Sequence, residues 1–178
     1  MKYLILLFIM TISVACSSEV TNDEGIEKLE DVDVVATVKG QEITLKDIRS
    51  LYFVEDEDVP KMVENFVEEE ILVLEAKSLG IDVTEEVEMM ESLFPLGESG
   101  NEEFFEAQAD YLGITVEEYY DTYFKERIER DAYMNHLIDE VLDLQNYEVD
   151  DAELVDNEIN DFINNLLEEY EEDIEIQL

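Results

Sequence analysis

The segment that most constrains the fold is residues 34–47, which have the pattern of a β-hairpin that continues directly into a helix. Apolar and more polar side chains alternate over residues 34–38, as in a strand with one buried face. The dipeptide Lys39-Gly40 then supplies a two-residue turn, and the strand pattern resumes up to Ile43. We therefore expect a hairpin and a helix to open the folded part of the chain.

The helix after this hairpin has its own start signal. Thr44 stands at the N-cap position, and Asp47 three residues later can return a hydrogen bond to it, as in a capping box. Ile43 and Ile48 flank the cap at the spacing of a hydrophobic staple. The helix is therefore predicted to begin at residue 44 and to reach about residue 53.

The last residues of the chain also have a strand pattern. Apolar and polar side chains alternate strictly over residues 174–178. A lone strand is unstable, and the only other strand material is the hairpin near residues 33–43. We therefore expect a mostly α fold in which a C-terminal strand over residues 173–178 completes a small sheet with the hairpin.

Helical spacing of apolar residues accounts for most of the chain between these strands. Glycine and proline mark several of the breaks, and Thr115 with Glu118 forms a second capping-box pattern. The expected helices cover residues 60–79, 85–94, 102–111, 115–144 and 151–170. Because hydrophobic residues make up 46% of the chain, residues 32–178 are predicted to form a single domain with a real core.

The N-terminal residues have the pattern of an export signal. Residues 1–15 contain one lysine, an apolar run and small residues before Cys16, the only cysteine of the chain. The sequence Ser13-Val14-Ala15-Cys16 resembles the lipobox of bacterial lipoproteins, which implies lipid attachment at Cys16 and a location on the extracytoplasmic face of the cell membrane. The alternative is ordinary signal cleavage nearby. Residues 16–31 are expected to form a flexible acidic spacer.

The charge balance is strongly acidic. The chain has 50 Asp and Glu residues against 10 Lys and Arg residues, a net charge of −40, which excludes nucleic acid as a direct partner. One interpretation is a solvated surface suited to saline or alkaline surroundings, and the other is recruitment of cations or basic partners. Residues 55–58, 68–70 and 168–173 are candidates for weak divalent-cation binding, but none has the EF-hand pattern, so no specific metal site is predicted.

Four segments together resemble one protein family. Residues 35–44 are similar to the pattern V-A-x-V-N-G-x-x-I-T, with Lys39 in place of asparagine, and residues 71–87 to A-x-x-x-G-I-x-V-T-x-E-E-V. Residues 112–119 resemble an L-G-I-T-x-E-E segment, and residues 162–178 a closing helix and strand. This order resembles the N-terminal chaperone domain of the SurA and PrsA type of extracytoplasmic foldases, and it covers nearly the whole chain after the spacer.

Prolyl isomerase activity is not expected. Proteins of the resembling family commonly carry a parvulin domain before the closing helix, whereas here the closing helix begins soon after residue 150. His136, the only histidine, cannot supply the pocket of such an isomerase and is expected to be a surface or half-buried structural residue. No phosphate loop, nucleophile elbow or zinc-ligand set is present in the sequence either. The chain is therefore predicted not to be an enzyme, and no cofactor is predicted.

The resemblance implies a holdase that binds unfolded or extended segments of exported polypeptides. The alternative is an adaptor lipoprotein that recruits one folded partner at the cell envelope. Binding would use apolar and aromatic side chains that leave the core, and adjacent helical positions point about 100° apart, so one member of each aromatic pair is expected to be exposed. The candidate binding residues are Phe94, Phe104, Phe105, Tyr119, Tyr120 and Tyr123, with Tyr52, Phe53, Met89 and Met90 as further candidates.

Overall fold

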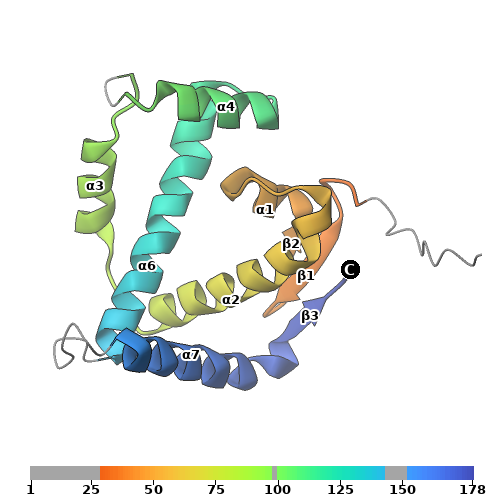
Figure 1. Ribbon diagram of the computed structural model, residues 1–178, viewed down its shortest axis with the longest axis vertical. Coiled ribbons are helices and arrows are strands. Elements are labelled where there is room, and N and C mark those ends of the chain that lie inside the picture. The colour runs from red at the N-terminus through yellow and green to blue at the C-terminus, as the bar shows by residue number, and fades with distance from the viewer. Residues whose placement is uncertain (1–28, 98–99, 143–151) are drawn as a thin grey trace, which may run out of the picture.

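A computed structural model of the chain describes residues 29–97, 100–142 and 152–178. The predicted signal segment, Cys16 and most of the predicted spacer lie outside these residues. The domain is mostly helical, with a small sheet at one end (Figure 1). This confirms the predicted mostly α fold class.

The sheet has three antiparallel strands. They are β1 (Val34–Val38), β2 (Gln41–Thr44) and β3 (Ile174–Ile176), in the spatial order β2-β1-β3. The register places Ala36 opposite both Ile43 and Ile176, which confirms that the C-terminal strand completes the hairpin. At the turn, Lys39 and Gly40 have φ angles of 49° and 78°, as a two-residue hairpin turn requires.

Helix α1 (Leu45–Leu51) begins where its cap signal predicts. The Asp47 N–H donates to Thr44 Oγ1 at 3.3 Å, and the Thr44 N–H donates to Asp47 Oδ2 at 2.8 Å, so the capping box is complete. Both residues of the predicted staple, Ile43 and Ile48, are buried. The hairpin and α1 therefore form one continuous unit.

Helix α2 (Val59–Ser78) is the centre of the main core. It has Pro60 in its first turn, and its apolar stripe packs against β1, α6 (Lys125–Val141) and α7 (Ala152–Glu169). The fully buried residues of this main core include Val35, Val38, Leu45, Ile48, Val63, Ile71, Ala76 and Leu137.

The rest of the chain forms an arm on the other side of α6 (Lys125–Val141), with α3 (Thr84–Leu93) alongside it and α4 (Glu102–Leu112) across its end (Figure 1). The helix predicted from residue 115 is not α-helical along its whole length. It starts as α5 (Val116–Glu118), continues as a π-helical segment (Tyr119–Phe124) and becomes α-helical only from Lys125. This wider segment carries the aromatics that pack against α4.

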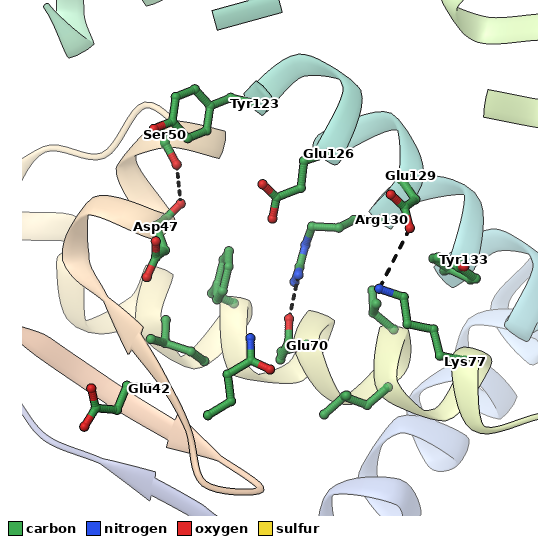
Figure 2. Close-up of a pocket in the computed structure, with 15 residues that line it drawn as sticks. Glu42, Asp47, Ser50, Glu70, Lys77, Tyr123, Glu126, Glu129, Arg130 and Tyr133 are labelled. Carbon is green, nitrogen blue, oxygen red and sulfur yellow. Dashed lines mark hydrogen bonds and ion pairs between the residues drawn. The ribbon is translucent and has the colours of Figure 1, made fainter. Parts of the chain in front are cut away.

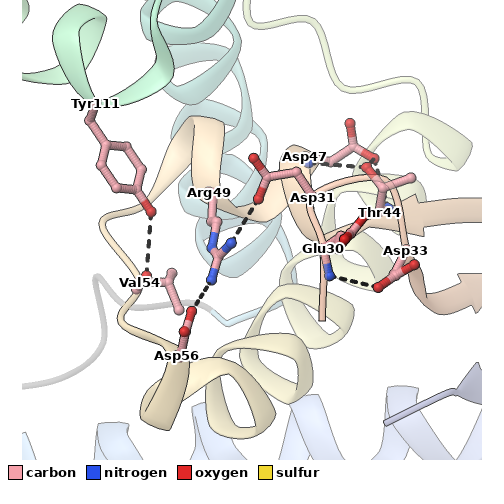
Figure 3. Close-up of polar contacts among 9 residues, drawn as sticks. All are labelled: Glu30, Asp31, Asp33, Thr44, Asp47, Arg49, Val54, Asp56 and Tyr111. Carbon is pink, nitrogen blue, oxygen red and sulfur yellow. Dashed lines mark hydrogen bonds and ion pairs between the residues drawn. The ribbon is translucent and has the colours of Figure 1, made fainter. Parts of the chain in front are cut away.

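Arg49 fixes the entry of the chain into the domain. Its guanidinium contacts Asp31 Oδ1 at 2.7 Å and Asp56 Oδ1 at 2.5 Å (Figure 3). Nearby in the chain, Leu29 packs against the main core. Residues 29 and 31, at the C-terminal end of the predicted spacer over residues 16–31, therefore contact the folded domain.

Candidate functional site

A cleft of about 560 Å³ lies in the V between α2 and α6, and α1 and β2 close one side of it (Figure 2). Its walls combine apolar and aromatic side chains with charged ones. The apolar and aromatic part comprises Ile43, Phe66, Val73, Leu74, Tyr123 and Tyr133, and the charged part comprises Glu42, Asp47, Glu70, Lys77, Glu126, Glu129 and Arg130.

A buried ion pair crosses the cleft. Arg130 reaches from α6 to α2, where its Nη1 donates to Glu70 Oε2 at 2.6 Å, and both side chains are more than nine-tenths buried (Figure 2). The guanidinium also lies over the ring of Phe66, 4.5 Å from its centroid. This pair holds the two helices together, because loss of either partner would leave an uncompensated buried charge.

Arg130 is not fully satisfied by these contacts. Its Nε and Nη2 atoms are buried and have no hydrogen-bond partner among the residues that the structure describes. Nη2 is 3.9 Å from Glu69 Oε2, which is an ion-pair distance but too long for a hydrogen bond. The cleft therefore contains two donor groups that have lost water without gaining an acceptor, an arrangement that is uncommon in native proteins.

Carboxylates surround this guanidinium on the walls of the cleft. Glu129 Oε1 is 3.9 Å from Lys77 Nζ, and Asp47 is held by the helix cap. Partial desolvation raises the pKa of Glu126 against the lowering effect of Arg130, and nearby carboxylates, including Asp47, raise it further. The wall that carries Glu126 is therefore an environment that disfavours a further negative charge.

A second polar network fixes the end of α1 behind the cleft. The Tyr52 hydroxyl donates to Glu69, and the Arg127 guanidinium lies 4.6 Å from the centroid of the Tyr52 ring. Arg127 Nη1 also donates to the Leu51 carbonyl at 2.8 Å. Burial raises the pKa of both Tyr52 and Glu69. These contacts connect α1, α2 and α6, and so set the position of the cleft walls.

Most of the predicted binding aromatics lie elsewhere. Phe105, Tyr119 and Tyr120 are 1%, 2% and 7% exposed and, with Ala109, form a satellite core between α4 and the π-helical segment. The expectation that one of Tyr119 and Tyr120 leaves the core is wrong, because the π-helical segment directs both rings toward α4. These three residues therefore present no surface for a partner.

The other predicted aromatics have different surroundings. Phe104 is 48% exposed, as expected for one member of its pair, and Phe94 is half-buried with its ring against Phe124. Tyr123 packs against both cores and lines the cleft. Of the six predicted residues, the structure brings only Tyr123 to the cleft.

The sequence reasoning missed the charged residues of the cleft, although one signal was available. Glu70 lies four residues after Phe66 and three before Val73, so it stands on the apolar stripe of its helix. A carboxylate at such a position needs a buried cation. Arg130, on another helix with a buried face, was the available partner.

The structure also describes the surroundings of the only histidine of the chain. His136 is 44% exposed, and its Nε2 lies 2.5 Å from Glu86 Oε2, which fits the structural role expected for it. In the ranges that the structure describes, no three acidic, histidine or cysteine side chains are grouped so as to hold a metal ion. Within the same ranges, no helix is both long and apolar enough to span a membrane.

The fold and cleft define a mostly helical domain whose small sheet joins both ends of the described chain, with a charged and aromatic cleft between two helices. Comparison with family models, curated proteins and solved structures finds no match to this chain.

Proposed function

We propose that this protein is a chaperone-like binder of unfolded or extended polypeptide segments, and that the cleft between α2 and α6 is where it holds them. The observation that carries the proposal is the composition of the cleft. Its volume of about 560 Å³ is in the range of ligand-binding sites, and the half-buried rings of Tyr123 and Tyr133 offer aromatic surface beside unsatisfied donors. An extended polypeptide presents the same mixture of apolar side chains and main-chain polar groups.

The sequence resemblance to the SurA and PrsA type of N-terminal domain supports the same function. We further propose an extracytoplasmic lipoprotein that acts without isomerase catalysis, and the lipobox-like sequence that ends at Cys16 supports attachment through a lipid on that residue. The finer SurA-like fold is part of this proposal. The common elements would be the opening hairpin and the closing helix and strand. In this chain the hairpin and the closing strand form one sheet.

The test is suppression of client aggregation by the purified protein without its predicted signal segment. The proposal expects a substoichiometric to stoichiometric amount of domain to slow the aggregation of a chemically unfolded client and to bind it reversibly. A pull-down from membranes with the full-length protein distinguishes the holdase from the alternative, an adaptor that recruits one folded partner. Many clients in small amounts support the holdase, whereas one stoichiometric folded partner and no effect on aggregation would contradict it.

A further inference from the structure

The charges that line the cleft are unbalanced. Its five acidic residues face only two cations, and both cations already have acidic partners, since Arg130 contacts Glu70 and Lys77 contacts Glu129. Glu126 has no hydrogen bond or ion pair within the described ranges of the chain. An occupant that brings a positive charge would therefore enter a favourable field.

A second observation points to the chemical class of this occupant. The Nε and Nη2 groups of Arg130 are buried donors without acceptors, and the side chain as a whole is 8% exposed. A metal ion or a simple polyamine offers no acceptor to such donors, whereas the carbonyl oxygen of a peptide group does. The occupant that satisfies both features is a polypeptide with a basic side chain.

Glu126 and Arg130 are placed to act on one ligand. They stand four residues apart on α6, so their side chains lie on the same face of the helix, and both line the cleft (Figure 2). Glu42 and Asp47 approach the cleft from β2 and α1, and they extend the negative surface along its side.

We infer that the cleft selects extended segments that contain a lysine or arginine. Glu126, with Glu42 and Asp47, binds the basic side chain, and the free donors of Arg130 bind a main-chain carbonyl next to it. This inference rests on the proposed function and gives it a specificity. It distinguishes the cleft from a purely apolar groove, which would be indifferent to the charge of the client.

The test uses fluorescence anisotropy with three labelled peptides of equal length that differ only at the central residue, which is lysine, glutamine or glutamate. At low ionic strength the lysine peptide should bind about fivefold more tightly than the glutamine peptide, the range expected for one partly exposed ion pair, and the glutamate peptide should bind more weakly still. The preference should shrink as salt is added, because the carboxylates are partly exposed to solvent.

Two variants assign the roles. Glu126→Gln should remove most of the preference for lysine, whereas Glu88→Gln, an exposed residue of α3 outside the cleft, should leave it unchanged. Arg130→Lys keeps a cation beside Glu70 but lacks the guanidinium donors, so it should weaken all three peptides alike. Circular dichroism and thermal melting confirm that each variant is folded before its binding is compared.

The outcomes of these experiments distinguish failure of this inference from failure of the proposed function on which it rests. Equal binding of the three peptides, or a lysine preference that survives Glu126→Gln, would overturn the inference and leave the holdase proposal standing. Unchanged binding by a folded Arg130→Lys variant would overturn the role given to the Arg130 donors. Failure of all three peptides to bind, together with failure to suppress aggregation, would overturn both proposals.

Discussion

Ala36 of the first strand pairs with Ile176 of the last, so the two ends of the described chain are joined in one sheet. Apart from β2, the described elements between these two strands are helices, and α7 returns along α2 to deliver β3 to the free edge of β1 (Figure 1). Because β1 is the central strand, it depends on both its neighbours for hydrogen bonds. The position of β2 beside the cleft therefore depends on residues near the C-terminus.

The pair Ile174 and Ile176 tests this closure. Ile174 is partly buried and packs against the main core, whereas Ile176 is 43% exposed. Ile174→Ala should lower the free energy of unfolding by about 1–2 kcal/mol, and Ile176→Ala by less than about 1 kcal/mol. Urea unfolding followed by circular dichroism gives both values. A larger loss for Ile176→Ala than for Ile174→Ala would contradict the observed packing of β3.

The buried ion pair between Arg130 and Glu70 predicts that loss of one partner alone costs more stability than loss of both. Arg130→Met leaves Glu70 buried without a cation and should cost about 3–5 kcal/mol of stability. The double variant Arg130→Met with Glu70→Leu should regain most of this loss, because no buried charge remains. Lys61→Met, which removes an exposed pair with Glu64 at 3.7 Å, is the control and should change stability by less than about 0.5 kcal/mol. Additive losses in the double variant would show that the two residues do not interact.

Adjacent phenylalanines in α4 provide a matched test of the satellite core. Phe105 is fully buried against Tyr120 and Phe124, whereas Phe104 is half exposed. Phe105→Ala should lower the free energy of unfolding by about 3–5 kcal/mol, and Phe104→Ala by less than about 1 kcal/mol. Denaturant midpoints measure the difference. Similar losses for the two variants would mean that α4 is not packed as described.

The pKa shifts predict a dependence of stability on pH. Burial raises the pKa of Glu69, and partial desolvation raises the pKa of Glu126, so the folded protein takes up protons at a higher pH than the unfolded chain. Their contribution to stability is present below the ordinary carboxyl pKa of about 4.3 and is lost as the pH rises through the raised value. The free energy of unfolding should therefore increase as the pH falls from 7 toward the ordinary carboxyl pKa.

Glu69→Gln separates this effect from the general relief of charge repulsion in an acidic chain. The amide keeps an acceptor for the Tyr52 hydroxyl but cannot titrate. As the pH falls, the free energy of unfolding should therefore increase less steeply in the variant than in the parent protein. Urea unfolding at pH 7, 6 and 5 measures both slopes. Identical slopes would remove Glu69 as a source of the dependence.

The local signals in the sequence predicted most of the fold. The hairpin turn, the cap at Thr44 and the closing strand depend on residues that are near neighbours or that have a single possible partner, and all three are confirmed. The helices also lie close to their predicted ranges. The π-helical segment was not predicted, because a capped helix with an apolar stripe looks the same in sequence whether its turns are α-helical or π-helical.

The site was much harder to predict, because it depends on which helix faces which. Adjacent aromatics such as Tyr119 and Tyr120 suggested an exposed surface, but tertiary packing against α4 buries both. The cleft is instead made by α2 and α6, and nothing local in either helix indicates that Arg130 meets Glu70 across it. A charge on an apolar stripe was the one relevant signal, and it identifies a buried pair without naming its partner.

A single tryptophan placed in the cleft tests the central claim most directly, since the chain has no tryptophan of its own. Tyr133→Trp puts the reporter on the cleft wall, and Tyr111→Trp puts it on the exposed face of α4, outside the cleft. Titration with an unfolded client that lacks tryptophan should give a saturable blue shift of the emission in Tyr133→Trp and none in Tyr111→Trp. No change at position 133, or a shift at position 111 alone, would contradict the assignment of the cleft as the polypeptide-binding site.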